Sequence, residues 1–373
     1  MNVGQLQQGL LRRLNRYRQF RVVTAAELTA ENPVSWREVF PEWQTIWPTK
    51  LPSGELPTLM SDRLSTRLPA KGVLHLQDAF ILGDHGWIFA AGRCVGDTTN
   101  YVADPTWMPR TYLPLIKSKA RFLAGRTLSL LSNWGATNFF HMQIDVIPRV
   151  DFLFRAGWKW TDFDHILLPS FHSSTIDRQL ALIGIPMEKI IFVKWGPLNF
   201  FRTEQLVCTS YPGGRRTVLA PAIDYLRQLN KFPLRNGKRR LFVRRMARTR
   251  HLRNENELLP LLEKRGFEII DPASFSHVEE IFHDAEFVVG PHGASLANLA
   301  FCRPGTRVLE LVPSDQAYPF FYTIAVHGGL RYDCLIGKSD QETFHPPGET
   351  WNSPSDFTVD PRVFAQALDR LIG

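Results

Sequence analysis

Patterns that would signal a metal-binding or disulfide-linked protein are missing from this sequence. Its four cysteines stand far apart and form neither a C-x-x-C pair nor a Cys/His cluster at zinc spacing. A zinc-finger protein and a small disulfide-linked domain are therefore excluded. We expect all four to be reduced core residues of a cytoplasmic protein: Cys94, Cys208, Cys302 and Cys334.

Long apolar segments are also missing. Nowhere do about 18 apolar residues follow one another, as a membrane-spanning helix requires, and residues 1–23 lack the apolar core of a signal peptide. We expect neither a membrane span nor export by a signal peptide. Residues 1–20 can instead form a short basic amphipathic helix that contacts anionic lipid. A helix docked on the protein, with a solvated charged face, is the alternative.

Acidic residues are outnumbered by basic ones, at 36 Asp and Glu against 44 Lys and Arg, which gives a net charge of +8. This excess favours acidic partners such as nucleotide phosphates, anionic lipids or nucleic acid. Hydrophobic residues make up 44% and charged residues 21% of the chain, which excludes intrinsic disorder. At 373 residues the chain is longer than one core usually serves, so we expect two domains with a cleft between them.

The texture of the sequence changes along the chain. From residue 127 short apolar strands alternate with amphipathic helices, which is typical of parallel α/β sheets with helices on their faces. A Gly- and Pro-containing run from Tyr211 to Pro221 interrupts the alternation and predicts a domain boundary. The predicted organisation is an irregular leader (1–70), an N-terminal α/β domain (71–215), a C-terminal doubly wound, Rossmann-like domain (216–345) and a tail whose helix packs back toward the first domain (346–373).

Helices are predicted in several places. Two lie over about residues 137–156 and 174–183, and the last lies over about residues 361–372. Asn254 followed three residues later by Glu257 predicts a capping box at the start of another helix. Doubly wound sheets bind nucleotides outside the carboxyl ends of their strands, so we expect ligand-binding residues there.

The segment EFVVGPHGASLAN, residues 286–298, carries the clearest ligand-binding pattern. A buried strand ends in a loop with Gly290, His292 and Gly293 and passes directly into a helix of small residues. Free backbone N–H groups and the positive helix end suit a diphosphate. Gly293 allows close approach, His292 can donate to a phosphate or ribose oxygen, and Asn298 lies in the helix. The alternative is a mere tight turn, and the loop matches neither G-x-G-x-x-G nor Walker A.

A run of arginines begins at the end of the strand predicted over RRLFVRR, residues 239–245, and continues beyond it. Guanidinium groups at strand ends can bind phosphate oxygens in pairs and stabilise a leaving nucleoside diphosphate without a metal. A solvated loop or a stripe for RNA or DNA is the alternative, but few aromatic residues lie nearby to stack bases, so we expect no nucleic acid. The run comprises Arg244, Arg245, Arg248, Arg250 and Arg253.

The helix predicted over residues 137–156 carries His141 and Asp145, four residues apart and therefore on one face. Asn138 shares that face. Either the imidazole or the carboxylate could act as the base that deprotonates an acceptor hydroxyl. A hydrogen bond along the helix face, with no part in catalysis, is the alternative.

Three other features leave two interpretations each. Asp162 and Asp164 resemble a metal-binding D-x-D pair, but they precede their strand, so we predict a turn. Glu310 ends a strand and accepts from a ribose or sugar hydroxyl, or caps a neighbouring loop. The aromatic residues from Tyr318 to Tyr322 either stack on a ligand or pack in the core.

Three segments, in this order, resemble glycosyltransferase family 61: NFFHMQIDVIPRV, FVRRMARTRHLRNENEL and FVVGPHGASLANLAFCRPGTRVLEL. The resemblance covers Leu128 to Pro313. It implies a GT-B architecture of two Rossmann-like domains facing across a cleft, inversion at the anomeric carbon by direct displacement and no obligatory metal. Members of the family use different donors, including N-acetylglucosamine and pentoses, so the resemblance does not name the sugar.

The family's motifs assign roles to individual residues. Many relatives carry Trp directly after the histidine, where this chain has Met142. This chain therefore lacks the aromatic ring that could form a platform for the acceptor at that position. The acceptor-side motif falls on Asn138, His141, Asp145, Pro148 and Arg149. The donor-side motifs fall on Arg244, Arg250, Asn254, Glu255, Gly290, His292, Gly293, Ala294, Asn298 and Glu310.

We therefore expect an inverting glycosyltransferase that moves a sugar from a UDP-linked donor to a glycan or glycolipid acceptor in bacterial surface polysaccharide biosynthesis. The expected location is the cytoplasm, with residues 1–20 at the inner face of the membrane, and no cofactor is expected. Another nucleotide-dependent group transferase, such as a phosphoglycosyl or pyruvyl transferase, is one alternative, which product analysis would separate. A non-catalytic sugar- or nucleic-acid-binding protein is the other, and a steep salt dependence of polynucleotide binding would indicate it.

Overall fold

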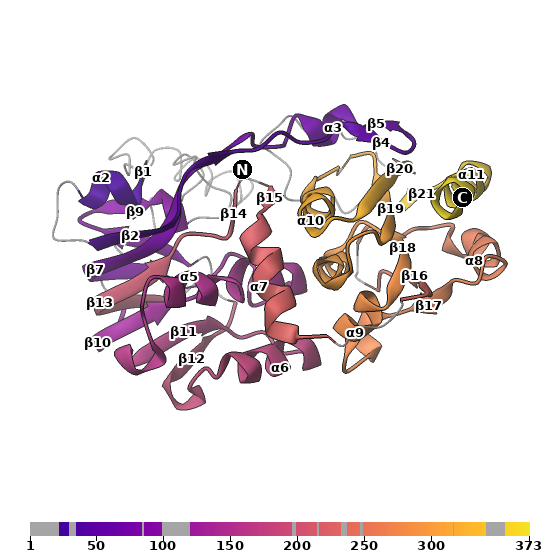
Figure 1. The fold of residues 1–373 in the computed structure, drawn as a ribbon. Coiled ribbons are helices and arrows are strands. Elements are labelled where there is room, and N and C mark those ends of the chain that lie inside the picture. Colours follow the sequence, from indigo (N-terminus) through magenta and orange to yellow (C-terminus); the bar gives the residue numbers. More distant parts are fainter. Residues whose placement is uncertain are drawn as a thin grey trace, which may run out of the picture. The chain divides into compact units, whose positions relative to one another are not determined.

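The described chain divides into two compact units (Figure 1). Unit 1 comprises residues 1–43, 69–171 and 184–212, and unit 2 comprises residues 44–68, 172–183 and 213–373. Residues 1–20, expected to form the amphipathic helix, and Arg248 lie outside the described residues. The computed structural model describes residues 22–29, 35–83, 86–98, 120–195, 199–214, 216–232, 237–246, 249–315, 317–340 and 355–373.

Unit 1 is built on one large mixed sheet. Its strands follow the order β1-β9-β8-β7-β13-β10-β11-β12, and β2 also pairs with β7. The neighbours from β13 to β12 are parallel, whereas β7 is antiparallel to β13, β8 and β2. The strands are β1 (Val22–Val23), β2 (Ser35–Phe40), β7 (Lys71–Leu82), β8 (Trp87–Ala90), β9 (Arg93–Val95), β10 (Arg121–Ser129), β11 (His165–Pro169), β12 (Ile190–Val193) and β13 (Phe200–Thr209).

The core of unit 1 forms where apolar side chains of neighbouring strands meet. Leu76 of β7 and Leu206 of β13 are paired in register, and both are buried in one cluster with Ile81. Helix α5 packs against β7 and β13. The helical segments of the unit are α2 (Ala25–Thr29), η1 (Gly96–Thr98), the π-helix η3 (His141–Val146), α5 (Arg149–Arg155), η4 (Trp160–Asp162) and η5 (Met187–Lys189).

Unit 2 is built on a second sheet of order β17-β16-β18-β19-β20-β21. Every neighbour pair from β17 to β20 is parallel, and only the short β21 runs antiparallel. The predicted α/β class with parallel sheets is thus confirmed. The strands of this sheet are β16 (Arg239–Val243), β17 (Glu268–Ile270), β18 (Ala285–Pro291), β19 (Arg307–Pro313), β20 (Arg331–Ser339) and β21 (Phe357–Thr358).

Helices cover both faces of the sheet of unit 2. Apolar residues of α8 and α11 share a buried cluster with Phe242, Val289 and Leu309 of the strands. In Figure 1, α10 lies on the opposite side of the strands from α11. The helices are α3 (Thr58–Ser61), α6 (Ser174–Ile183), α7 (Ala220–Asn230), α8 (Glu255–Glu263), η6 (Pro272–Ser274), α9 (Val278–His283), η7 (Ala294–Phe301), α10 (Phe320–Gly328) and α11 (Pro361–Ile372).

Three small two-stranded sheets complete the described structure. They are β3 (Trp43–Gln44) with β6 (Arg67–Leu68), β4 (Lys50–Leu51) with β5 (Gly54–Glu55), and β14 (Gly213–Gly214) with β15 (Thr217–Val218). All four cysteines are buried and free of disulfides. Among the helices that the structure describes, none has the length and apolarity to cross a membrane.

The structure differs from the predicted organisation at both ends of the chain. Residues 35–40, expected within an irregular leader, form β2, and residues 44–68 belong to unit 2. In this segment Trp47 is buried, donates a hydrogen bond to the Ser65 carbonyl and contacts the Tyr322 ring. An individual side chain therefore anchors the segment, although its sequence shows no helical or strand periodicity. Helix α11, expected against the first domain, packs on the sheet of unit 2, because its apolar stripe meets α8 and β19.

Candidate functional site

The sheet of unit 2 reverses its strand order beside its first strand. β16 has β17 on one side and β18 on the other, so the parallel strands follow the order 2-1-3-4-5 when counted from β16. The loops after β16 and β18 therefore diverge, and such sheets bind ligands between loops of this kind. The arginine run follows β16 and the His292 loop follows β18. The structure thus brings both predicted donor segments to this switch point.

Arg245 lies against the His292 loop. A Cβ atom added to Gly293 would come within 2.3 Å of Arg245 Nη1, so a larger residue at this position would displace the guanidinium. Arg245 Nε donates to the Thr249 carbonyl over 2.8 Å, which holds the side chain in place. Burial, together with the positive charge of Arg250, lowers the pKa of Arg245 to about 9. The sequence motifs gave Arg245 no role, although it belongs to the same arginine run.

Arg250 follows Arg245 in the same loop, and its backbone has a conformation that residues other than glycine rarely adopt. Its φ is +62°, in the left-handed region. Burial lowers the pKa of Arg250, and the charge of the Asp315 carboxylate opposes that shift. Arg250 and Arg245 in turn help to lower the pKa of His292. Because these charges act on one another, the two arginines and the imidazole belong to one site.

His292 is held by a buried carboxylate. Its Nδ1 lies 2.5 Å from Glu310 Oε1, and the Tyr332 hydroxyl donates to Glu310 Oε2 over 2.5 Å. Burial lowers the pKa of His292 although the Glu310 charge raises it. The His292 N–H donates to the Leu311 carbonyl over 2.8 Å, so this amide is not free for a phosphate as expected. Both Glu310 oxygens have protein partners, and Glu310 orients the imidazole.

Two other predicted donor residues bond to one another. Arg244 Nε and Nη2 lie 2.7 and 2.6 Å from Glu255 Oε1, and the Arg244 side chain is 41% exposed. Asn254 precedes α8 but makes no cap hydrogen bond, so the predicted capping box is wrong. Its amide instead bonds the backbone N–H and carbonyl of Val359, at 3.1 and 2.8 Å. The Asn254 side chain therefore bonds the C-terminal segment of the chain instead of capping α8.

The remaining donor-side residues build the loop and its helix. Gly290 lies in β18, where an added Cβ would lie 3.0 Å from the Val243 carbonyl oxygen of β16. Ala294 opens η7, which is a 3-10 helix. Asn298 is buried, and its Nδ2 donates to the Ser295 carbonyl over 2.9 Å. Small residues therefore let β16, β18 and the loop approach one another closely.

The parallel strands of unit 1 also reverse their order, in this case between β10 and β13. β10 has β11 on one side, and the chain returns to its other side as β13 only after β12. The segment with His141 follows the carboxyl end of β10, and Tyr211 follows that of β13. The predicted acceptor-side motif therefore lies at the switch point of its own sheet.

The two candidate bases lie in a π-helix, His141–Val146, which interrupts the predicted α-helix. The Ile147 N–H bonds the Met142 carbonyl, five residues back, over 3.2 Å. Such turns are frequent at functional sites. His141 Nδ1 lies 2.7 Å from Asp145 Oδ2, and both residues are buried. The pair forms one hydrogen-bonded unit in which the carboxylate fixes the orientation of the imidazole.

Arg149 joins the two strands of the switch point. It is 1% exposed, and its guanidinium donates to the carbonyls of Ser129, Leu131 and Thr209 at 3.2, 2.8 and 3.2 Å. It also donates to Thr209 Oγ1 at 2.7 Å. Burial lowers the pKa of Arg149, and the charge of Asp145 is among those that oppose this shift. This predicted acceptor-side residue therefore ties the ends of β10 and β13 and stabilises the Asp145 carboxylate.

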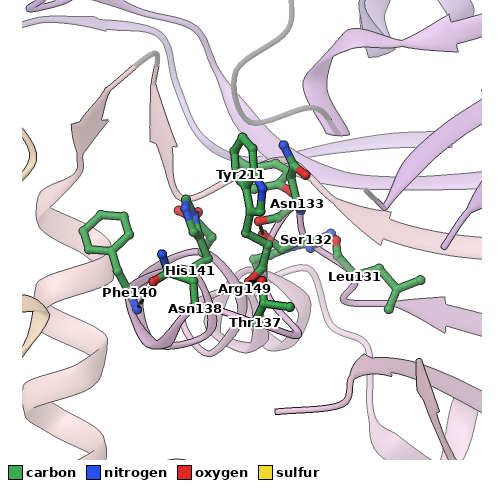
Figure 2. Close-up of polar contacts among 11 residues, drawn as sticks. Leu131, Ser132, Asn133, Thr137, Asn138, Phe140, His141, Arg149 and Tyr211 are labelled. Carbon is green, nitrogen blue, oxygen red and sulfur yellow. Dashed lines mark hydrogen bonds and ion pairs between the residues drawn. The ribbon is translucent and has the colours of Figure 1, made fainter. Parts of the chain in front are cut away.

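Figure 2 shows Asn133, Tyr211 and Arg149 beside the helical segment that contains His141. The Tyr211 ring centroid lies 5.3 Å from the Arg149 guanidinium carbon, and the Tyr211 hydroxyl accepts from the Asn133 N–H over 3.2 Å. Burial raises the pKa of Tyr211 to about 12. The Trp134 ring lies 5.3 Å from the His141 ring. No motif marks Asn133, Trp134 or Tyr211, and only their places after β10 and β13 could have found them.

Other predicted polar residues serve the fold. Asn138 Oδ1 accepts from the Phe140 N–H over 2.9 Å, so it caps the helix that begins there. Asp162 ends the 3-10 helix η4 and accepts from the Lys159 N–H over 2.8 Å, and Asp164 accepts from the Arg126 N–H over 2.7 Å, so both carboxylates bind backbone groups. Within the part of the chain that the structure describes, no three His, Cys, Asp or Glu side chains lie close enough to hold a metal ion together.

We predict that Arg149→Met lowers the free energy of unfolding by about 3 kcal/mol or more, because three backbone carbonyls lose their donor and Asp145 loses a neighbouring positive charge. Arg155→Met on the same helix is the control, because Arg155 is 52% exposed, pairs with Asp151 and has its guanidinium carbon 5.4 Å from the centre of the Phe40 ring. That change should stay within about 1 kcal/mol. Urea unfolding measures both, and equal losses in the two variants would contradict the role of Arg149.

We also predict a pH dependence of stability through His292. Because burial lowers its pKa below the ordinary 6.5, the unfolded chain takes up the proton before the folded one. The free energy of unfolding should therefore fall as the pH drops below 6.5, with a contribution of up to about 1.4 kcal/mol per pH unit from this group. His292→Gln should flatten that slope in urea titrations at pH 7.5, 6.5 and 5.5. An unchanged slope would mean that His292 is charged in the folded state.

Comparisons with known proteins agree with this geometry. A family model described as Glycosyltransferase 61 matches residues 139–309. The chain is 29% identical over 104 residues to alpha-1,3-arabinosyltransferase XAT2 of Oryza sativa subsp. japonica, a match that covers 26% of this chain and 17% of the relative. It is 31% identical over 121 residues to beta-1,2-xylosyltransferase RCN11 of the same plant, covering 27% of this chain and 22% of the relative.

The matched parts span about a fifth of each curated relative. The family model begins within the segment that carries His141 and includes the arginine run and the His292 loop. The matched range therefore contains every site residue that the sequence motifs predict, except Asn138 and Glu310, which lie one residue outside it. The resemblance found in the sequence is confirmed over this range, because residues 139–309 match the model of glycosyltransferase family 61.

Proposed function

We propose that this protein is an inverting glycosyltransferase of GT-B type that moves a sugar from a nucleotide-sugar donor to a glycan or glycolipid acceptor. The observation that carries the proposal is the switch point of unit 2. There Arg245 lies against the His292 loop, and Arg250 belongs to the same run of arginines, at the carboxyl edge of a parallel sheet where two loops diverge. Guanidinium groups at such an edge suit a nucleoside diphosphate.

The donor is proposed to bind unit 2 through its diphosphate. As the bond between the anomeric carbon and the diphosphate oxygen breaks, negative charge grows on the leaving group. Arg245 and Arg250 would stabilise that charge without an obligatory metal, since their positions are fixed before the reaction begins. We propose UDP as the nucleotide. The names of the two rice relatives, an arabinosyltransferase and a xylosyltransferase, favour a pentose.

Unit 1 is proposed to activate the acceptor. Asp145 occupies Nδ1 of His141, so Nε2 is the nitrogen that would take the proton of an acceptor hydroxyl. The acceptor oxygen then attacks the anomeric carbon from the face opposite the diphosphate, which inverts the configuration. Asp145 stabilises the imidazolium that forms. In this proposal His141 is the base and Asp145 is the positioning residue.

An aromatic platform for the acceptor is proposed at Trp134. Met142, which replaces the Trp of many family members, is fully buried and cannot offer a surface to a sugar. Trp134 is half-buried, and its ring lies beside that of His141. Its φ of +58° is a strained backbone conformation for a tryptophan. Sugars pack readily on aromatic faces, so Trp134 would hold the acceptor next to the base.

The biological setting remains part of the proposal. The acceptor would belong to surface polysaccharide biosynthesis, and the reaction would take place in the cytoplasm, with residues 1–20 in peripheral contact with anionic lipid. These statements derive from the sequence. The basic excess of +8 supports an acidic donor and an acidic membrane surface alike.

The test is a transfer assay on the full chain with UDP-xylose, UDP-arabinose, UDP-glucose and UDP-N-acetylglucosamine, with EDTA throughout. His141→Gln should lower kcat by about 10²- to 10⁴-fold, because general base catalysis is lost, and should leave UDP affinity unchanged. Asp145→Asn should lower kcat in the same way. Arg250→Gln should instead weaken UDP binding.

An exposed His–Asp pair supplies the matched control. His172 Nδ1 lies 3.2 Å from Asp177 Oδ1 at the surface, so His172→Gln should leave kcat and UDP affinity as they are. A kcat of His141→Gln within a factor of ten of the wild type would exclude it as the base. Nucleotide binding without transfer to any acceptor would contradict the proposed reaction and favour a binding protein.

A further inference from the structure

Two arginines from distant parts of the chain place their guanidinium groups over the Tyr318 ring. The guanidinium carbon of Arg63 lies 4.7 Å from the centre of the Tyr318 ring, and that of Arg216 lies 5.1 Å from it. Arg63 comes from the segment 44–68, and Arg216 lies between β14 and β15. Both distances fall within the range of cation–π attraction. All three residues belong to unit 2.

This cluster borders the candidate donor site. The Tyr318 and His292 rings lie 6.3 Å apart, and Arg245 lies against Gly293, the residue after His292. Tyr318 therefore connects Arg63 and Arg216 with the arginines of the switch point. The family motifs assign no role to Arg63, Arg216 or Tyr318, and Arg63 and Tyr318 lie outside the range that the family model matches.

The arginines are held in fixed positions. Arg63 Nη1 donates to the Ala317 carbonyl over 2.8 Å, beside the ring on which its guanidinium stacks. Stacking uses the flat face of a guanidinium and leaves its N–H edge for planar acceptors such as phosphate. Arg216 and Arg250 both have a φ of +62°. Such strained conformations cost about 1 kcal/mol or more each and cluster at ligand clamps.

Several guanidinium groups of the described residues lie around Tyr318 and the His292 loop. Those of Arg63 and Arg216 lie on the Tyr318 ring, Arg245 lies against Gly293, and the positive charge of Arg250 acts on Arg245. The carboxylates whose charges act on Arg250 and Arg245 are Asp315 and Asp356, and Asp356 also faces Arg253 at 3.5 Å. Like charges held together in a half-buried place repel one another, and a bound polyanion relieves that repulsion.

We propose that Arg63 and Arg216, held against Tyr318, bind the diphosphate of the donor together with Arg245 and Arg250. The ligand class is an organic or inorganic diphosphate, because two or more phosphoryl groups can engage guanidiniums that come from three separate chain segments. The identity of this diphosphate as part of a nucleotide sugar rests on the proposed function. Tyr318 is the positioning residue that keeps the two outer guanidiniums in place.

The test is isothermal titration of the full chain with inorganic pyrophosphate and, separately, with UDP. Arg63→Gln and Arg216→Gln should each raise the pyrophosphate Kd at least 10-fold, since each removes a charge-assisted contact. Tyr318→Leu leaves every charge in place and should raise the Kd about 3- to 10-fold through loss of the stacked geometry, which is worth about 1 kcal/mol. Arg63→Lys and Arg216→Lys, which keep the charge, should give intermediate values.

Arg240 is the matched control. Its guanidinium carbon lies 5.1 Å from the Phe287 ring centre, and its Nη1 donates to the Arg265 carbonyl over 2.8 Å, so it makes the same two kinds of contact as Arg63. It lies at the amino-terminal end of β16, away from the carboxyl edge. Arg240→Gln should change the Kd less than twofold.

The outcomes separate this inference from the proposed function. Pyrophosphate affinities of Arg63→Gln and Arg216→Gln equal to that of Arg240→Gln would overturn the inference, as would a wild type that binds no pyrophosphate. Transfer activity could still be found in either case. Conversely, selective loss of pyrophosphate binding in a protein that transfers no sugar would support the inference and contradict the proposed function. Near-UV circular dichroism establishes that each variant is folded.

Discussion

The candidate site of each unit depends on one constraint, the reversal of strand order among the parallel strands of its sheet. Parallel strands present their carboxyl ends at one edge, and only where the order reverses do neighbouring loops diverge and leave room for a ligand. In unit 1 the reversal lies between β10 and β13, and in unit 2 between β16 and β18. His141 and Asp145 follow the first, and Arg245 and His292 follow the second. Backbone topology therefore selects where the chemistry can lie.

Arginine serves two different purposes at these edges. Arg149 is fully buried, and its donors are taken up by strand-end carbonyls, so it stabilises unit 1 and the Asp145 carboxylate from within. Arg245 and Arg250 of unit 2 are half-buried, and burial together with the positive charge of Arg250 lowers the pKa of Arg245 to about 9. A buried guanidinium with all its partners strengthens a fold, whereas a group of repelling guanidiniums stores free energy that an anion releases.

Much of the architecture could be predicted from the sequence, because local patterns determine it. The helices predicted over residues 174–183 and 361–372 begin and end where α6 and α11 do. The α/β class followed from the same alternation of strands and helices. Contacts between distant segments could not be predicted in this way. Nothing local indicates that Asn254 bonds Val359 or that α11 packs on the sheet of unit 2.

The candidate site was predictable to the extent that motifs mark it. The pairing of His141 with Asp145 follows from their spacing, but the π-helix that carries them leaves no mark in the sequence. Glu310 was found by its place at a strand end, yet its bonds to His292 and Tyr332 depend on the packing of three strands. Arg63 and Tyr318 could not be connected, because they lie more than 250 residues apart in sequence and meet only in the fold.

The central claim is that a nucleoside diphosphate binds at the switch point of unit 2. Hydrogen exchange of backbone amides in the full chain, with and without saturating UDP and in EDTA, tests it most directly, because a ligand slows exchange where it stabilises the folded backbone. The account predicts protection concentrated in residues 241–250 and 288–296, with the amino-terminal ends of the same strands unchanged. Protection elsewhere in the chain, or none at saturating UDP, would contradict it.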